Sequence, residues 1–274
     1  MTSSTRTVTL TPTRDRGDAG LDLTVDERGE GRPFLLLHGG GGPQTVAGFA
    51  GLLAGSRPAR VITPVHPGFG GTARPDRLTG VRALAEVYVR LLDELGLDGV
   101  TVVGNSIGGW IAAEIALLHS ERVSGVVLVN AVGIHVPGHP VADPATLTPA
   151  ELSALAFHDP AKFAVDPSTF SEAQRAVAAA DRAALQVYAG PDTMSDPTLR
   201  ERLAKVTHQV LVAWGESDRV VDTAYGRAYA AAVPGARFEL LRRTGHMPQI
   251  ETPEQLLPVV WDFAASQAVD RPNG

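Results

Sequence analysis

Residues 102–110 read Val102-Val103-Gly104-Asn105-Ser106-Ile107-Gly108-Gly109-Trp110. The stretch joins an apolar run to a helical pattern over residues 110–119, and it contains the spacing G-x-S-x-G. Between a strand and a helix, this spacing is typical of a strained turn that lifts the Ser hydroxyl clear of the backbone. The sequence therefore predicts Ser106 as a nucleophile and the amide of Ile107, at a helix N-terminus, as a donor to an oxyanion.

Outward from this turn, short apolar runs alternate with helical patterns along most of the chain. Most of the runs lack polar alternation, which is typical of strands buried on both faces of a parallel sheet. They occupy residues 7–10, 21–26, 33–37, 60–65, 100–103, 123–129, 210–214 and 237–241. Helical patterns cover residues 81–95 and 254–265. The alternation predicts an α/β fold with right-handed crossovers.

The alternation of strand and helix patterns stops between residues 133 and 205. Several Pro residues and three helical patches, at 149–157, 171–188 and 197–204, replace it. We interpret this segment as a helical lid inserted before the penultimate strand, over the carboxyl ends of the strands, where open α/β sheets bind ligands. The predicted organisation is a core domain of residues 1–132 and 206–274 and a lid of residues 133–205.

A second glycine-rich turn, residues 38–42, follows the run at 33–37 and reads His38-Gly39-Gly40-Gly41-Gly42. A phosphate-binding loop is one interpretation, but Gly-Lys-Ser/Thr is absent and no acidic residue closes the following strand. The other interpretation is a loop that supplies a second oxyanion donor, and we assign that donor to the amide of Gly40.

A serine nucleophile needs a general base and an acid that orients it. His246 follows the last apolar run and therefore lies at the same sheet edge as Ser106, whereas His119 and His208 fall at element ends. Three carboxylates follow the run at 210–214, and Asp218 comes late enough to turn back toward His246. The order Ser106, Asp218, His246 then predicts a catalytic triad, with Glu216 in the turn and Asp222 as the cap of the next helix.

These motifs resemble those of the α/β-hydrolase superfamily, from about residue 21 to residue 263. The matching segments are HGGGG at 38–42, HPGFGGT at 66–72, GNSIGG at 104–109, WGESDRVV at 214–221 and TGHMPQIETP at 244–253. The resemblance implies a mostly parallel eight-stranded sheet whose second strand is antiparallel, a helical lid and no cofactor. Val65 departs from the Asp that many members carry before the P-G-F-G turn.

The reaction predicted from the triad is hydrolysis of a carboxylic ester (EC 3.1.1) with a small or medium apolar substrate. In this reading Ser106 attacks the carbonyl, His246 moves its proton, and Asp218 holds the imidazole. Residues near these groups in the predicted topology are candidates for substrate contact: His38, Gly39, Trp110, Phe157, Met194 and Met247.

Alternative reactions use the same groups. HGGGG-P with GNSIGG is similar to the hydrolases that cleave carbon–carbon bonds in ring-fission products, although those usually carry Trp where this chain has Met247. Their lid also places an Arg against a substrate carboxylate, for which this chain offers Arg175, Arg182, Arg200 and Arg202. Cofactor-free oxygenases or lyases, and binding proteins that lost the triad, are further classes; the intact triad argues against binding alone.

The amino-acid composition excludes several classes of partner and of binding site. The 274 residues carry a net charge of −6, which argues against nucleic acid or an anionic membrane as partner. There is no cysteine, so disulfides and thiolate sites are excluded. His135, His139 and Asp143 suggest a metal site, but nearby Gly and Pro residues forbid the helix that such spacing requires, and we predict no metal. We expect a cytoplasmic enzyme without a signal peptide, a monomer or small homo-oligomer, acting on a small ester or acyl molecule.

Overall fold

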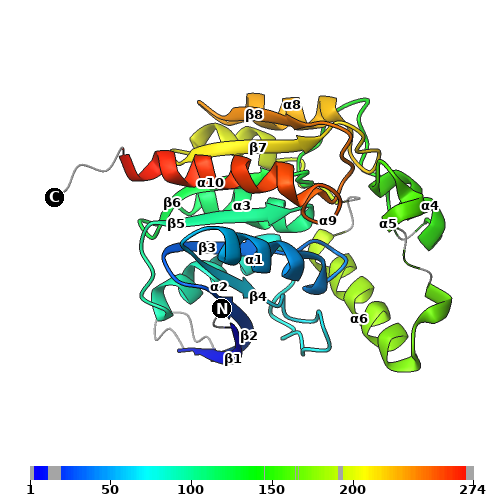
Figure 1. Cartoon of the computed structure of the whole chain (residues 1–274), viewed down its shortest axis with the longest axis horizontal. Coiled ribbons are helices and arrows are strands. Elements are labelled where there is room, and N and C mark those ends of the chain that lie inside the picture. Colours follow the sequence, from blue (N-terminus) through cyan, green and yellow to red (C-terminus); the bar gives the residue numbers. More distant parts are fainter. Residues whose placement is uncertain are drawn as a thin grey trace.

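One eight-stranded sheet forms the centre of the molecule (Figure 1). The structure is a computed structural model that describes residues 3–11, 20–144, 146–163, 165, 167–190 and 194–269. Its strands are β1 (Ser3–Leu10), β2 (Leu21–Arg28), β3 (Arg32–Leu37), β4 (Ala59–Pro64), β5 (Val100–Asn105), β6 (Val123–Val129), β7 (Gln209–Gly215) and β8 (Arg237–Leu241). All eight predicted strands are therefore present.

The strand order is β1-β2-β4-β3-β5-β6-β7-β8. Strand β2 runs antiparallel to both of its neighbours, β1 and β4, while β3 to β8 pair in parallel. The predicted fold class, an α/β-hydrolase fold with a mostly parallel sheet, is confirmed. Because β3 and β5 to β8 are parallel neighbours, the loops that follow them open at one edge of the sheet.

Two hydrophobic clusters cover the two faces of the sheet, and successive residues of its inner strands alternate between them. In β3, Phe34 and Leu36 pack with helices α1 (Gln44–Ser56) and α10 (Pro253–Val269). Leu35 and Leu37 pack with α2 (Val81–Glu94), α3 (Ile107–Leu117) and α8 (Thr223–Ala232) on the other face. This double burial explains why the sequence of these strands is apolar without alternation.

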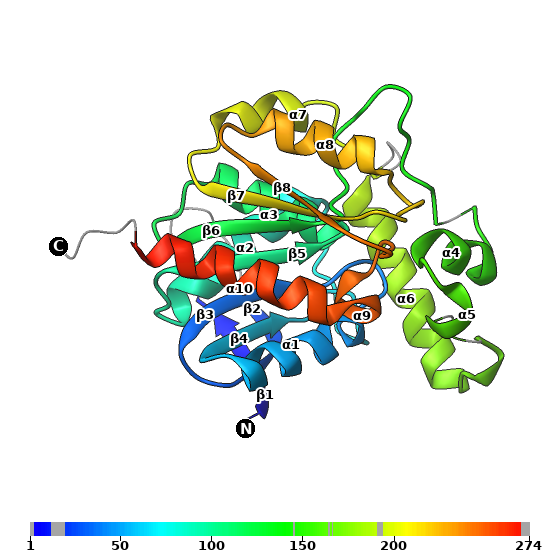
Figure 2. The same ribbon diagram turned by 45° about the horizontal axis from the view of Figure 1, so that its top comes forward.

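Between β6 and β7 lie α4 (Pro149–Ala156), α5 (Pro160–Phe163), the 3₁₀ turn η1 (Pro167–Thr169), α6 (Glu172–Ala189), α7 (Leu199–Arg202) and the 3₁₀ turn η2 (Leu203–Lys205). Helices α4, α5 and α6 gather beyond one end of the sheet, whereas α7 lies beside α8 (Figures 1 and 2). Helices α4 and α6 both begin with a capping box, from Thr148 and Ser171. The described residues of 133–205 are thus mainly helices and loops, and their assignment as a separate lid stays a prediction.

Two helical details differ from the sequence-based expectation. Helix α3 begins at Ile107 rather than at residue 110, because the Gly-rich turn is itself helical after Ser106. Helix α1 is absent from the prediction, since Gly48 and Gly51 weaken its helical pattern; burial of Phe49 and Leu53 against the sheet stabilises it nevertheless. Short α9 (Pro248–Glu251) follows β8. Among the described residues, no helix combines the length and apolar character needed to cross a membrane.

Candidate active site

Ser106 lies in the sharp turn between β5 and α3. Its backbone has φ 58° and ψ −120°, a strained region for a residue with a side chain, and its carbonyl accepts hydrogen bonds from Gly109 and Trp110 that start the helix. A Cβ at Gly104 would lie 2.1 Å from the carbonyl oxygen of Gly108, and one at Gly108 would lie 2.5 Å from that of Leu37. The glycines of G-x-S-x-G are thus required for the turn to close.

The glycine-rich loop after β3 approaches Ser106 directly. A Cβ at Gly39 would lie 3.2 Å from the Cβ of Ser106, so the two turns touch. Within the described parts of the chain, the amides of Gly40 and Ile107 donate no hydrogen bond to another residue. An oxyanion hole requires two unused donors beside a nucleophile, and this role of the two amides stays a prediction.

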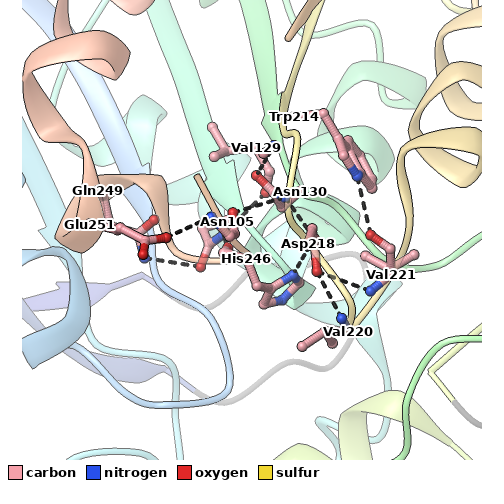
Figure 3. A network of polar contacts seen from close by, with 12 residues as sticks. Asn105, Val129, Asn130, Trp214, Asp218, Val220, Val221, His246, Gln249 and Glu251 are labelled. Carbon is pink, nitrogen blue, oxygen red and sulfur yellow. Dashed lines mark hydrogen bonds and ion pairs between the residues drawn. The ribbon is translucent and has the colours of Figure 1, made fainter. Parts of the chain in front are cut away.

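His246 and Asp218 form a buried pair at the carboxyl ends of β8 and β7. Nδ1 of His246 lies 2.8 Å from Oδ2 of Asp218, and the Asp218 side chain has no exposed surface. The other carboxylate oxygen, Oδ1, accepts the amides of Val220 and Val221 at 2.9 and 3.1 Å (Figure 3). The structure thus brings together the base and acid predicted from the sequence, in the tautomer that leaves Nε2 of His246 free to take a proton.

Asn105 holds the main chain of His246 in place. Its Nδ2 donates to the carbonyl of His246 at 2.9 Å and to that of Val129 at 3.2 Å. Its Oδ1 accepts from Nε2 of Gln249 at 3.1 Å (Figure 3). The sequence prediction treated Asn105 only as part of the turn; its signal is a polar residue within an otherwise apolar strand end. The residue beside the nucleophile therefore ties the base to the sheet.

His38 and His66 stack inside the core, with ring centroids 3.7 Å apart. Nε2 of His38 accepts the backbone amide of His66, so its Nδ1 donates to the carbonyl of Gly39 at 2.8 Å. Nε2 of His66 donates to the carbonyl of His38 at 2.9 Å, leaving Nδ1 to accept from the hydroxyl of Tyr88. Burial lowers the pKa of His38 to about 4 and that of His66 well below its usual value. Both rings are therefore neutral supports of the glycine loop, and substrate contact by His38 stays a prediction.

The second half of α6 lies on the glycine loops. A Cβ at Gly40 would lie 2.7 Å from Cδ2 of Leu185, and Oδ1 of Asp181 accepts the amide of Gly70 at 2.8 Å. Tyr188 donates its hydroxyl to the carbonyl of Pro67 at 2.8 Å. Burial raises the pKa of Asp181, partly offset by the bond from Gly70. Through these contacts, the helix that the sequence assigns to the lid shapes the loop that carries Gly40.

Helix α4 lies on the other side of the site, against the His246 loop. The amide of His246 donates to the carbonyl of Ala156 at 2.6 Å. Phe157 is buried in a cluster with Val220, and Met247 packs against that cluster. Two of the predicted substrate-contact residues, Phe157 and Met247, therefore meet beside the base, although substrate contact by either is still a prediction.

The remaining predicted contact residues are spread more widely. Trp110 is buried in α3 and packs on Gly133, where a Cβ would lie 2.5 Å from its ring. The indole N–H of Trp110 has no hydrogen-bond partner within the described residues. Met194 is buried with φ 60°, in the same cluster as α3 and α6. A substrate role for Trp110 and Met194 stays a prediction.

The four candidate arginines lie in different surroundings. Arg202 is paired with Glu114 at 2.6 Å and Asp196 at 2.7 Å. Arg175 donates to a backbone carbonyl close to it in sequence. Arg182 and Arg200 are exposed. The structure brings none of these four guanidinium groups into a recorded contact with the residues of the triad.

The histidines considered for a metal site do not converge. Nδ1 of His139 lies 2.6 Å from Oδ2 of Asp222 instead of meeting His135 and Asp143. In the ranges of the chain that the structure describes, no three His, Cys, Asp or Glu side chains are grouped so that they could hold a metal ion. The other oxygen of Asp222 accepts the amide of Tyr225 at 2.9 Å, which confirms Asp222 as the cap of α8.

Comparison with known proteins adds a family and a reaction to this geometry. The model of the alpha/beta hydrolase family matches residues 34–259. A 2-hydroxymuconate semialdehyde hydrolase of Pseudomonas putida is 31% identical over 90% of this chain and 92% of its own length. A 2-hydroxy-6-oxo-2,4-heptadienoate hydrolase of P. putida strain F1 is 29% identical over 90% and 94%. A crystallised meta-cleavage product hydrolase of Pseudomonas fluorescens IP01 shares the fold with a TM-score of 0.71 and 20% identity, over 89% of this chain and 95% of that one.

These relatives contradict the ester reading of the sequence. Their names describe dienoate and semialdehyde hydrolases, which fits the carbon–carbon alternative better than a carboxylesterase. The prediction was wrong because Ser106, Asp218 and His246 serve acyl transfer in general, and nothing in their motifs encodes the atom bonded to the carbonyl. Hydrolase chemistry itself is supported at the level of the family.

Proposed function

Since the chain belongs to the alpha/beta hydrolase family, we propose that it hydrolyses the carbon–carbon bond beside the 6-oxo group of a 2-hydroxy-6-oxo-2,4-dienoate. The observation that carries the proposal is the 31% identity, over nine tenths of both chains, to a 2-hydroxymuconate semialdehyde hydrolase. The triad geometry supports it, because the reaction needs a nucleophile, a proton carrier and an oxyanion hole in the arrangement described above.

In the first step, the hydroxyl of Ser106 attacks the C6 carbonyl while Nε2 of His246 takes its proton. Asp218 holds the imidazole and stabilises the imidazolium through the 2.8 Å bond to Nδ1. The amides of Ile107 and Gly40 then hold the oxyanion of the tetrahedral intermediate. Four separate loops, after β3, β5, β7 and β8, supply these groups, and the contacts of Gly39 with Ser106 and of Asn105 with His246 hold these loops together.

The leaving group is a carbanion, which makes this reaction more demanding than ester cleavage. In the 2-oxo tautomer of the substrate, C5 carries two hydrogens, and the electron pair of the breaking C5–C6 bond is delocalised through the C3–C4 double bond to the oxygen at C2. The imidazolium of His246 supplies the proton that yields 2-hydroxypenta-2,4-dienoate. Water, deprotonated by His246, then hydrolyses the acyl-Ser106 ester and releases the carboxylic acid.

The test is a direct assay of carbon–carbon cleavage with the purified protein. Incubation with 2-hydroxymuconate semialdehyde and with 2-hydroxy-6-oxo-2,4-heptadienoate should release 2-hydroxypenta-2,4-dienoate together with formate and acetate, respectively, identified by mass spectrometry. Ser106→Ala should release neither product. Ser124→Ala is the matched control, because Ser124 lies at the opposite end of the sheet and bonds to the carbonyl of Gly99.

The decisive negative result is a protein that reacts with an organophosphonate at Ser106 yet leaves both dienoates intact. That outcome would refute carbon–carbon hydrolysis of these substrates while keeping the serine nucleophile. Absence of phosphonate labelling would refute Ser106 as the nucleophile, so the assignment of the nucleophile and the assignment of the substrate can fail separately.

A further inference from the structure

Asn130 occupies an unusual position directly after β6. It is fully buried, its backbone has φ 46°, and its amide donates to the carbonyl of Ala213 at 3.0 Å. A left-handed conformation is unfavourable for most residues with a side chain and least so for Asn and Asp. The fold therefore keeps a polar side chain at the carboxyl end of the central sheet, in a conformation that aims it at the neighbouring strand end.

The side-chain amide of Asn130 reaches the acid of the triad. Its Nδ2 donates to Oδ2 of Asp218 at 2.6 Å, and its Oδ1 accepts the amide of Gly215 at 3.3 Å (Figure 3). A longer contact of 3.5 Å joins Nδ2 to the carbonyl of Gly245. The same Oδ2 of Asp218 accepts Nδ1 of His246, so the amide and the imidazole share one carboxylate oxygen.

We propose that Asn130 is a positioning residue for the reaction: its amide fixes the Asp218 carboxylate against His246 and withdraws charge from the oxygen that the imidazole uses. With the two amides on Oδ1, the carboxylate of Asp218 accepts four hydrogen bonds. Such a carboxylate cannot rotate without losing at least one bond. The inference rests on the assignment of Asp218 and His246 that the proposed function uses, and it does not depend on the substrate.

The other charged groups near Asn130, Asp218 and His246 bond to partners outside this network. Glu216 accepts the amide of Arg243 and faces Arg242 at the surface, and Arg219 donates to the carbonyls of Ala154 and Phe157. On α9, Glu251 accepts the amides of Gly245, His158 and Asp159. Asp218 and His246 are therefore the titratable pair that a change at Asn130 affects first.

Two substitutions separate positioning from structural support. Asn130→Leu keeps the approximate size and removes both hydrogen bonds at every pH. Asn130→Asp retains an acceptor for the amide of Gly215 at every pH, but it can donate to Asp218 only while the introduced carboxyl is protonated. Because that carboxyl lies next to Asp218, the pair holds its proton to higher pH than a lone carboxyl would.

The measurement is the second-order rate constant for organophosphonate labelling of Ser106, followed from pH 5.5 to 9 in the full-length protein, with circular dichroism as a check on folding. This readout requires no natural substrate, so it stays interpretable if the dienoates prove to be wrong. Thr101→Val is the matched control, because Thr101 is a buried residue of β5 whose hydroxyl has no partner among the described residues.

We expect Asn130→Leu to label about 10- to 100-fold more slowly than the wild type at pH 8, because the Asp218 carboxylate is no longer held against His246. Asn130→Asp should stay within about threefold of the wild type near pH 6 and fall at least tenfold behind by pH 9. Thr101→Val should follow the wild-type profile.

The proposal is overturned if Asn130→Leu labels as fast as the wild type. It is also overturned if both Asn130 variants lose the same factor at every pH, which is what a purely structural role predicts. Should Asn130→Leu fail to fold, the pH dependence of Asn130→Asp alone decides, since that variant keeps the bond to Gly215.

Discussion

The two sides of Ser106 are built on opposite electrostatic principles. On one side, the β7 and β8 loops carry a charged carboxylate, Asp218, whose oxygens are fully occupied by donors from Asn130, His246 and two backbone amides. On the other, the glycine loop after β3 rests on two stacked histidines that burial keeps neutral. The loops after β7 and β8 therefore surround a carboxylate with hydrogen-bond donors, whereas the glycine loop rests on rings that carry no charge.

The contrast has a chemical rationale. A developing oxyanion at the amides of Gly40 and Ile107 needs fixed dipoles, and the titration of a supporting histidine would move the loop that carries them. The imidazolium that forms at His246 instead needs a permanent negative partner. Helix α6 does not follow this division: it meets the glycine loop through Leu185 at Gly40 and through its buried carboxylate, Asp181, at Gly42, and Asp181 also accepts the amide of Gly70.

The largest effect expected is at Ser106, on which both sides converge. An organophosphonate probe should label the wild type once, on the peptide that contains Ser106, and should leave Ser106→Ala unlabelled, because the strained turn lifts this hydroxyl clear of the backbone. Peptide mapping by mass spectrometry checks the site. Labelling that persists in Ser106→Ala would show that Ser106 is not the nucleophile.

Asp218→Asn tests the charged side. The side-chain amide of the introduced asparagine is uncharged, so it cannot act as the negative partner of His246. Its NH₂ group also replaces one carboxylate oxygen, either the oxygen that accepts His246 and Asn130 or the oxygen that accepts the two backbone amides. We expect kcat to fall by about 10⁴-fold, the factor known for the same change in a serine protease triad, with KM nearly unchanged. Steady-state kinetics on a cleaved dienoate measure both constants. A decrease of less than about tenfold would show that the charge of Asp218 is dispensable.

Because the stacked rings of His38 and His66 are neutral, we predict that the protein loses stability in mild acid. The pKa of His38 is about 4 in the fold and near 6.5 when unfolded, so the unfolded chain binds more protons between these values. The stabilisation from neutral His38 is complete above pH 6.5 and is lost as the pH falls toward 4. At pH 5 the loss from His38 alone is about 2 kcal/mol of unfolding free energy, and His66 adds in the same direction.

Urea titrations at pH 7, 6 and 5 measure this loss. His38→Gln should be less stable at pH 7 but should show a shallower decrease toward pH 5, because one of the two titrating rings is gone. His119→Gln, a change at an exposed histidine, is the matched control and should keep the wild-type slope. Equal slopes in all three proteins would mean that the buried pair does not exclude protons.

Sequence was sufficient for the parts of this molecule that repeat simple patterns. The strands were predictable because burial on both faces removes alternation, as in Leu35 and Leu36. Ser106 was predictable because only glycine fits at Gly104 and Gly108. Asp218 and His246 followed from their place after β7 and β8, and the structure places them in contact.

The features that could not be predicted from the sequence depend on tertiary contacts. Asn130 shows no local signal, since its partner Asp218 lies 88 residues away. The buried stack of His38 on His66 was not expected, because the two residues come from different loops. The chemistry of the leaving group was missed for a different reason: the triad acts on the acyl carbon in ester hydrolysis and in carbon–carbon hydrolysis alike, so its motifs do not separate the two reactions.

The smallest expected effect concerns the two other carboxylates near Asp218, Glu216 and Asp222. Glu216 accepts the amide of Arg243 at 3.0 Å at the surface. Asp222 caps α8 through the amide of Tyr225 and pairs with His139. Neither has a recorded bond to His246. Glu216→Gln and Asp222→Asn should therefore each keep kcat within about tenfold of the wild type, a barrier change below about 1.4 kcal/mol.

Asp222→Asn retains a capping side chain, because asparagine accepts from the same backbone amide, so a change in stability of no more than about 1 kcal/mol is expected. The assay is kcat on the same dienoate used for Asp218→Asn, with urea unfolding beside it. If Glu216→Gln abolished turnover while Asp218→Asn remained active, the acid would lie two positions earlier in the loop. The charged side of the site would then be organised around a surface carboxylate rather than around the buried network of Asn130, which the four hydrogen bonds on Asp218 argue against.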